Sequence, residues 1–87
     1  MAKVEIYTSF FCGFCYRAKS LLNSKTAEYD EIDIMLHPNR RAEMIERAAG
    51  ETSVPQIFIN GAHIGGSEEL SALEQEGRLD DLLAAAP

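Results

Sequence analysis

The alternation of short apolar runs with helical segments is the feature that most limits what this chain can fold into. Residues 3–8 (KVEIYT) and 27–34 (AEYDEIDI) alternate apolar and polar side chains as strands do. The stretch between them, residues 12–25 (CGFCYRAKSLLNSK), has apolar residues at helical spacing. Two strands joined by one helix are typical of a parallel pair, because the helix carries the chain back across the sheet. A layered α/β fold is therefore expected.

The second half of the chain adds a helix and a hairpin. A helix over residues 38–50 is predicted, because Pro38 is suited to a first helical position and Gly50 to a stop. Asn60 and Gly61 stand together between two apolar runs, which is the strongest short-range signal of a tight hairpin. The hairpin supplies the last two strands of the predicted sheet.

The C-terminal region is predicted to be helical. Ser67 is the expected N-cap of a helix with acids in its first turn, and Gly77 separates that helix from a short one at 79–85. The predicted fold is one domain over residues 1–87, in the order β-α-β-α-β-β-α, with a four-stranded mixed sheet flanked by helices. The expected core-facing side chains are Phe14, Ala18, Leu21 and Leu22 on the first helix, Tyr29, Ile32 and Ile34 on the second strand, and Ala42, Ile45 and Ala49 on the second helix.

The charge balance argues against two classes of partner. Eight basic and fourteen acidic residues give a net charge of −6, which disfavours non-specific binding to nucleic acid or to an anionic membrane. No run of residues is as long and apolar as a membrane span, and the N-terminus lacks the pattern of a signal peptide. We therefore expect a cytoplasmic protein with no nucleic-acid and no membrane partner.

Cys12 and Cys15, the only cysteines, allow three interpretations. A zinc site needs two further ligands, and the chain offers only His37 and His63, far apart in the sequence. A purely structural disulfide would close a loop too small to constrain the unfolded chain much. The third interpretation is a redox pair, which is typical of a C-x-x-C motif beside a βαβ pattern in a cytoplasmic chain. The redox pair is the favoured interpretation.

The position of the two cysteines on the helix predicts different functions for them. Cys12 lies between a strand and the first helical turn, where free N–H groups and the helix dipole stabilise an anion. We therefore expect Cys12 to be the attacking thiolate. Cys15, one turn further on and closer to the core, is the expected resolving thiol, which attacks a mixed disulfide formed on Cys12.

Three segments together resemble the glutaredoxin family over nearly the whole chain. They are IYTSFFCGFCYRAKSLL (6–22), TSVPQIFINGAHIGGSEEL (52–70) and LEQEGRLDDLL (73–83). The resemblance implies a thioredoxin-like fold, glutathione as thiol cofactor, and a cis peptide bond between Val54 and Pro55. It also implies reduction of oxidised proteins and of glutathionylated proteins, with Cys12 and Cys15 as the catalytic pair. As an enzyme the protein is expected to be a monomer with no metal.

Residues from three parts of the sequence are the expected glutathione contacts. Val54, held extended by the proline that follows it, offers a backbone edge to which an extended peptide can pair. The N–H groups at the start of the helix after Gly66 can hold a carboxylate, and Glu68 can meet the ammonium group of the γ-glutamyl end. The full set that the resemblance implies is Phe14, Ser53, Val54, Pro55, Gly66, Ser67 and Glu68.

The chain departs from the family pattern at two basic positions. Many glutaredoxins have a lysine three residues before the first cysteine, where this chain has Ser9. They commonly have a basic residue shortly before the Val-Pro pair, where Thr52 stands here. Both changes remove a positive charge near the site. Arg40, Arg41 and Arg47 are the candidates to replace it, although arginines also suit a solvated helix face.

Gly13 after the first cysteine opens an alternative function. In the resembled family, proline at this position accompanies plain dithiol enzymes, and several members with glycine or serine assemble a [2Fe–2S] cluster. Glycine would let Cys12 turn outward to a shared metal. Four sulfur ligands are needed, and Cys12 from each of two subunits with two glutathione molecules would supply them. The alternative is therefore a cluster carrier that is dimeric only when the cluster is bound.

Other side chains near these motifs have simpler interpretations. His63 is interpreted as a hairpin residue with no acid–base function. Phe10 and Phe11 form either an apolar rim for a partner protein or contacts in the core.

Overall fold

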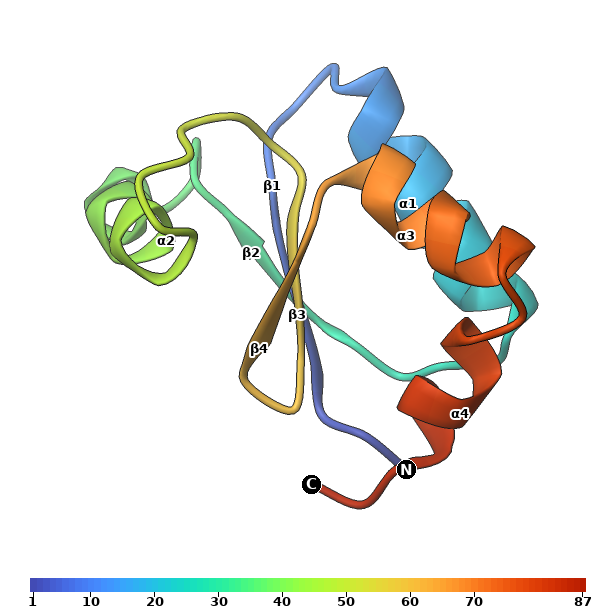
Figure 1. The fold of residues 1–87 in the computed structure, drawn as a ribbon. Coiled ribbons are helices and arrows are strands. Elements are labelled where there is room, and N and C mark those ends of the chain that lie inside the picture. The colour runs from blue at the N-terminus through green and yellow to red at the C-terminus, as the bar shows by residue number, and fades with distance from the viewer.

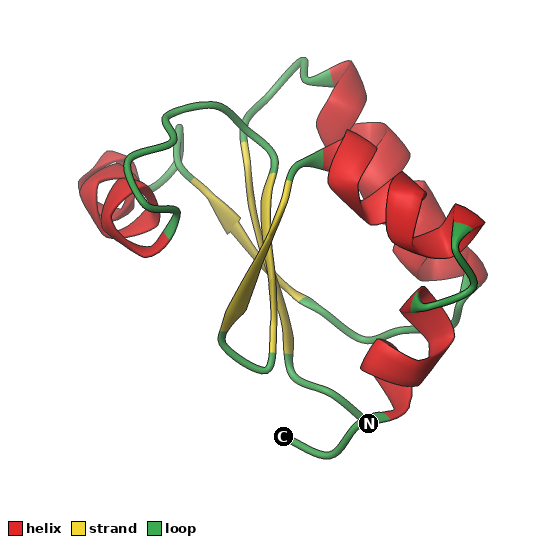
Figure 2. Ribbon diagram, viewed as in Figure 1, coloured by secondary structure: helices red, strands yellow, loops and turns green.

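The structure, a computed structural model, describes residues 1–87 and consists of a central sheet with helices on both faces. Figure 1 shows α1, α3 and α4 on one side of the sheet and α2 on the other, and Figure 2 separates helices, strands and loops by colour. The strands are β1 (Val4–Thr8), β2 (Asp30–Asp33), β3 (Gln56–Ile59) and β4 (Ala62–Gly65). The helices are α1 (Gly13–Ser24), α2 (Arg41–Arg47), α3 (Ser67–Gln75) and α4 (Leu79–Ala84), and a 3₁₀ turn, η1 (Pro38–Arg40), leads into α2.

The sheet has the order β2-β1-β3-β4, with β2 and β4 at its edges. β1 and β2 are parallel, as expected for two strands joined by helix α1, and the other two pairs are antiparallel. Asn60 and Gly61 have φ angles of 52° and 81°, the two positive values that a type I′ hairpin turn requires. The predicted mixed four-stranded sheet and its hairpin are confirmed.

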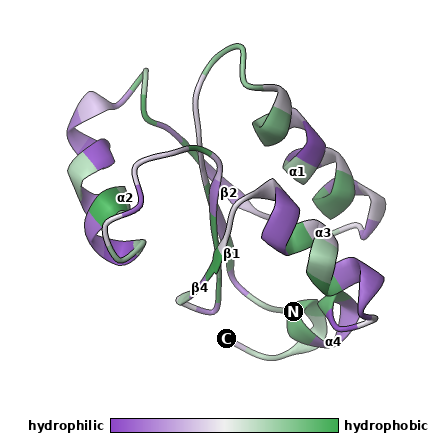
Figure 3. Ribbon diagram, turned by 45° about the horizontal axis from the view of Figure 1, so that its top comes forward, coloured by the Kyte–Doolittle hydropathy of each residue, from purple (hydrophilic) through white to green (hydrophobic).

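Each face of the sheet buries its own apolar cluster. α1, α3 and α4 cover the larger one, and purple and green stretches alternate along α1 and α3 in Figure 3, as they do in helices that bury one face. The larger cluster consists of Val4, Ile6, Ala18, Leu22, Ala27, Ile57, Ile59, Leu70, Leu79 and Leu83. The cluster on the α2 side consists of Tyr7, Ile32, Met44, Ala48 and Phe58.

The predicted stripe of the second helix is wrong at Ala42 and Ala49, whereas Ile45 is partly buried against the sheet as expected. Met44 and Ala48 are buried, whereas Ala42 and Ala49 are exposed. The segment has apolar residues on two adjacent faces, and the sheet contacts the face of Met44 and Ala48, with Ile45 at the margin of that contact. The α-helix itself is also shorter than predicted, because η1 occupies its expected first turn.

Two further expectations are corrected at helix starts. Phe14 is 54% exposed and faces away from the core, because it lies on the outer side of the first turn of α1. Gly66, and not Ser67, is the N-cap of α3. The capping interaction comes from Glu69, whose Oε1 accepts the Gly66 N–H at 2.7 Å.

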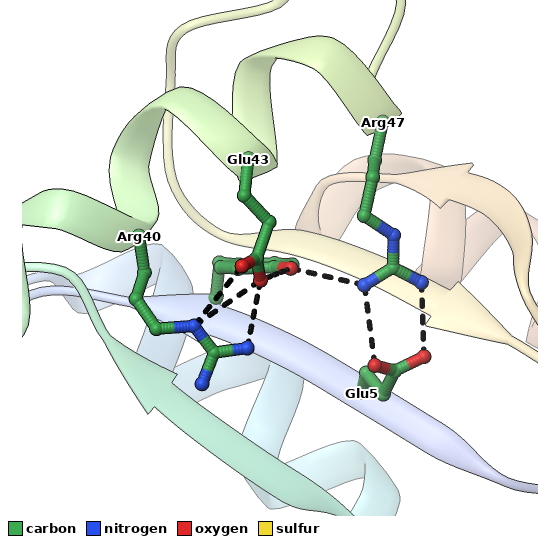
Figure 4. A network of polar contacts seen from close by, with 5 residues as sticks. Glu5, Arg40, Glu43 and Arg47 are labelled. Atoms are coloured by element: carbon green, nitrogen blue, oxygen red, sulfur yellow. Dashed lines mark hydrogen bonds and ion pairs between the residues drawn. The ribbon is translucent and has the colours of Figure 1, made fainter.

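A polar network ties α2 to the sheet (Figure 4). Arg47 donates to both carboxylate oxygens of Glu5, at 3.1 and 2.9 Å, and to the Tyr7 hydroxyl oxygen at 2.9 Å. The Tyr7 hydroxyl in turn donates to Glu43, which also pairs with Arg40. The Arg47 guanidinium holds the pKa of the Glu5 carboxyl below its ordinary value.

None of the helices has the length and apolarity to cross a membrane.

Candidate active site

Cys12 stands at the junction of the loop after β1 and helix α1. It is the N-cap of the helix, in an extended conformation (φ −106°, ψ 104°), and its Sγ accepts the Cys15 N–H at 3.1 Å. A sulfur in the N-cap position therefore receives one of the N–H groups that the first helical turn leaves without a partner. Cys12 is partly exposed, and its Sγ lies 3.8 Å from the Val54 carbonyl oxygen.

Cys15 lies beneath Cys12 and is 2% exposed. Burial raises the pKa of its thiol to about 12, and the neighbouring Cys12 adds to this, while the backbone of Ser9 opposes it. The free Cys15 side chain is thus held as a neutral thiol, out of reach of a large substrate. This asymmetry supports the prediction that Cys12 attacks and Cys15 resolves.

The residues expected to contact glutathione lie together beside the cysteines. They line one open pocket of about 260 Å³, between the start of α1, the segment before β3 and the start of α3. The peptide bond between Val54 and Pro55 is cis, as the family resemblance implies. The pocket is lined by Phe14, Ser53, Val54, Pro55, Gly66, Ser67, Glu68 and Glu69.

The turn from β4 into α3 forms one wall of this pocket. A Cβ at Gly66 would lie 3.3 Å from the Pro55 carbonyl oxygen, so glycine lets the two backbone segments approach closely. Glu69 is folded back onto the Gly66 N–H, whereas Glu68 is exposed and makes no hydrogen bond or ion pair in the protein. Glu68 is therefore available to a ligand. Glu69 was missed as a pocket residue, although its spacing from Gly66 is that of a capping box.

Aromatic side chains surround the cysteines on the outer surface. Phe10, Phe11, Phe14 and Tyr16 are all at least half exposed. Of the two interpretations left open for Phe10 and Phe11, the one that places them in the core is wrong, and a rim for a partner protein stays a prediction. A second pocket next to Cys12 is lined by Ser9, Phe10, Phe11, Cys12, Gly13, Cys15, Tyr16, Lys19, Glu31 and Asp33.

Comparisons with known proteins agree with this geometry. A sequence model of the family described as "Glutaredoxin" matches residues 4–64. The chain belongs to the glutaredoxin family. It is 52% identical over 83 residues to glutaredoxin 3 of Escherichia coli, which spans 95% of this chain and 99% of that protein.

Solved glutaredoxin structures have the same fold. A buckwheat glutaredoxin in complex with glutathione is 27% identical, with a TM-score of 0.86 over 94% of this chain and 76% of that one. A structure concerned with the metal binding of glutaredoxins is 52% identical, with a TM-score of 0.74 over 100% of this chain and 94% of that one. The fold is therefore thioredoxin-like, and family membership implies thiol redox chemistry.

The basic residues of this glutaredoxin differ in their availability to a ligand. Arg47 is engaged by Glu5 and Tyr7, and Arg40 is engaged by Glu43. Arg41 is exposed, and its Nη2 lies 3.4 Å from the carbonyl oxygen of Thr52, next to the pocket. Of the three arginines predicted as replacements for the family's basic residue, only Arg41 has no carboxylate partner, and its one hydrogen bond is to the Thr52 carbonyl oxygen.

Proposed function

We propose that this glutaredoxin is a glutathione-dependent thiol–disulfide oxidoreductase that reduces protein disulfides and protein–glutathione mixed disulfides. The observation that carries the proposal is the pocket beside Cys12, which gathers all seven residues expected to contact glutathione. Its partners would be glutathione and oxidised or glutathionylated proteins, and it would act as a cytoplasmic monomer over residues 1–87.

The reaction would begin on Cys12. Its thiolate attacks the glutathione sulfur of a glutathionylated protein, the S–S bond of the substrate breaks, and the protein thiolate leaves and takes up a proton from water. Glutathione remains bonded to Cys12 as a mixed disulfide. A second glutathione thiolate then attacks the sulfur of the bound glutathione, which forms oxidised glutathione and releases the Cys12 thiolate.

A protein disulfide would require both cysteines. Attack by Cys12 breaks the substrate disulfide, frees one substrate thiolate and leaves the other substrate cysteine bonded to Cys12. Cys15 then loses its proton to water and attacks the Cys12 sulfur. The Cys12–Cys15 disulfide forms and the second substrate thiol leaves. Two glutathione molecules supply the two electrons that return the pair to the dithiol.

The pocket residues suggest how glutathione would lie. The extended backbone at Val54 would pair with the cysteine part of the tripeptide, next to the Cys12 sulfur. The first-turn N–H groups of α3 would hold the γ-glutamyl carboxylate, and Glu68 would pair with its ammonium group. Arg41 would meet the glycine carboxylate at the other end.

Turnover of a small glutathione mixed disulfide, coupled to glutathione reductase and NADPH, tests this function. The wild-type protein should be active, and Glu68→Ala should lower kcat/KM for glutathione about ten- to hundredfold, because a charge-assisted hydrogen bond is lost. Attack on small disulfides without a glutathione moiety should be little changed.

Glu46→Ala is the matched control, since Glu46 is also an exposed helical acid and lies on α2. It should leave kcat/KM unchanged. An unchanged value in Glu68→Ala would show that Glu68 acts only as an acid at a helix start. No turnover by the wild-type protein would refute the proposed function itself.

A second candidate function is a glutathione-ligated [2Fe–2S] carrier. One observation favours it: each chain exposes one cysteine sulfur, that of Cys12, so two chains and two glutathione molecules would supply four ligands. The 52% identity to a glutaredoxin studied for metal binding is consistent with this candidate.

Gly13→Pro tests this candidate because the fold accommodates proline there. Residue 13 is the first of α1, Cys12 before it is extended, and no atom lies within 4 Å of an added Cβ. Anaerobic reconstitution with iron, sulfide and glutathione should give a brown dimer for the wild type, which Gly13→Pro should lose while keeping thiol turnover. A colourless wild-type monomer would eliminate the carrier, and a brown Gly13→Pro dimer would contradict the role of Gly13.

A further inference from the structure

Gln56, the first residue of β3, buries a side-chain amide directly behind the glutathione pocket. The residue is 1% exposed. Its Nε2 donates to the Ser53 carbonyl oxygen at 3.0 Å and lies 3.4 Å from both the Ser53 hydroxyl and the Glu51 carboxylate. Its Oε1 lies 2.6 Å from His63 Nε2 on β4. The amide therefore joins the segment before β3 to the neighbouring strand.

The partners fix which way this amide faces. The Ser53 carbonyl can only accept, so the amide NH₂ group has to face it, and Oε1 is left facing His63. An amide oxygen can only accept, so His63 has to present Nε2–H as the donor. Each group thus sets the orientation of the next.

His63 is itself held in place from the sheet. Its ring lies on Phe58, with the ring centroids 5.1 Å apart and the planes inclined by 33°. The same Phe58 ring carries the guanidinium of Arg47, whose central carbon is 4.1 Å from the centroid. A continuous series of contacts therefore runs from α2 across the sheet to Gln56.

We propose that Gln56, oriented by His63, is a positioning residue for glutathione; this rests on the proposed function. Residues 51–55 have no helix or strand of their own, and the Ser53 carbonyl is tied down by the Gln56 amide. That bond closes the turn that presents Val54 to the pocket. A backbone edge pairs well with an extended peptide only when its extended geometry is already fixed, because ordering it on binding would lower affinity.

Gln56→Met tests the proposal, because methionine keeps the length and volume of the side chain and removes every hydrogen bond. We expect KM for glutathione to rise about tenfold. The kcat should change less than about twofold, because Cys12 and Cys15 do not contact Gln56. Release of thiopyridone from 2,2′-dithiodipyridine by the reduced protein, a reaction without glutathione, should proceed at the wild-type rate.

Gln56→Glu gives a second readout from an isosteric side chain. The introduced carboxylate keeps an acceptor for His63 but loses the donor that faces the Ser53 carbonyl, and it lies against the carboxylate of Glu51. KM for glutathione should therefore rise as in Gln56→Met at neutral pH and return toward the wild-type value in acid, where the introduced carboxyl can donate. His63→Leu removes the donor to Gln56 Oε1 and leaves the bond from the amide to the Ser53 carbonyl in place, so it should raise KM by a smaller factor of about three.

Leu83→Val is the control for a general loss of stability, since Leu83 is buried in the core on α4 and does not line the glutathione pocket. It should lower the melting temperature and leave KM unchanged. An unchanged KM in folded Gln56→Met, or a KM in Gln56→Glu that does not depend on pH, would overturn the proposal. Absence of glutathione turnover in the wild type would instead refute the proposed function on which it rests.

Discussion

Cys12→Ser should abolish reduction of both glutathionylated proteins and protein disulfides, whereas Cys15→Ser should keep the first activity and lose the second. The reason is the unequal placement of the two sulfurs. Cys12 is partly exposed at the start of α1, and Cys15 is 2% exposed beneath it, with its pKa raised to about 12 by burial. Parallel assays on a glutathionylated protein and on a protein disulfide measure the two activities.

The expected losses of activity in Cys12→Ser and Cys15→Ser are large, so the two assays distinguish the roles of the two cysteines. Without Cys12 no covalent intermediate forms, so the rate should fall to that of glutathione alone. Without Cys15 a second glutathione still releases the mixed disulfide from Cys12. If Cys15→Ser lost deglutathionylation and Cys12→Ser kept it, the two assignments would be reversed.

Arg47→Met should destabilise the fold by about 2–4 kcal/mol at neutral pH, because it leaves the Glu5 carboxylate without a partner in a largely buried position. The side chains of Arg47 and Glu5 are only 29% and 16% exposed, and Arg47 also covers the Phe58 ring. For a chain of 87 residues this corresponds to a fall in melting temperature of roughly 10–20 °C. Thermal unfolding followed by circular dichroism measures it.

The stability lost in Arg47→Met should be largest at neutral pH and smaller in acid. Arg47 lowers the pKa of Glu5 in the folded state, so the stabilisation is present above the pKa that Glu5 has when unfolded and is lost as pH falls through the lowered value. The difference in unfolding free energy between wild type and Arg47→Met should therefore become smaller as the pH is lowered. Arg78→Met, which removes a pair with Glu76 whose side chains are 67% and 56% exposed, should change stability little. A wild-type melting temperature in Arg47→Met would show that the network contributes nothing.

Features encoded by neighbouring residues could be predicted from the sequence. Asn60 and Gly61 have few alternatives to a tight hairpin turn, and the structure has one there. The start of α1 at the cysteines follows from a strand pattern giving way to a helical one. The family resemblance supplied the seven residues expected to contact glutathione, and the fold brings all seven to one pocket.

Features decided by tertiary contact could not be predicted in the same way. α2 has apolar residues on two adjacent faces, and only the sheet beneath it selects Met44 and Ala48. Gln56 stands between Pro55 and an apolar run, where nothing in the sequence marks a buried amide. Its side-chain oxygen is bonded to His63, seven residues away and on another strand, so the contact exists only when the two strands are paired.

The edge strand β2 carries charges that oppose association of two molecules through its open side. It pairs on one side only, and three of its four residues, Asp30, Glu31 and Asp33, are acidic. An open strand edge is a template for pairing with another chain, and charged side chains along it oppose that association. Two copies that approach through β2 bring rows of like charge together, so the opposition is electrostatic and concentrated salt weakens it.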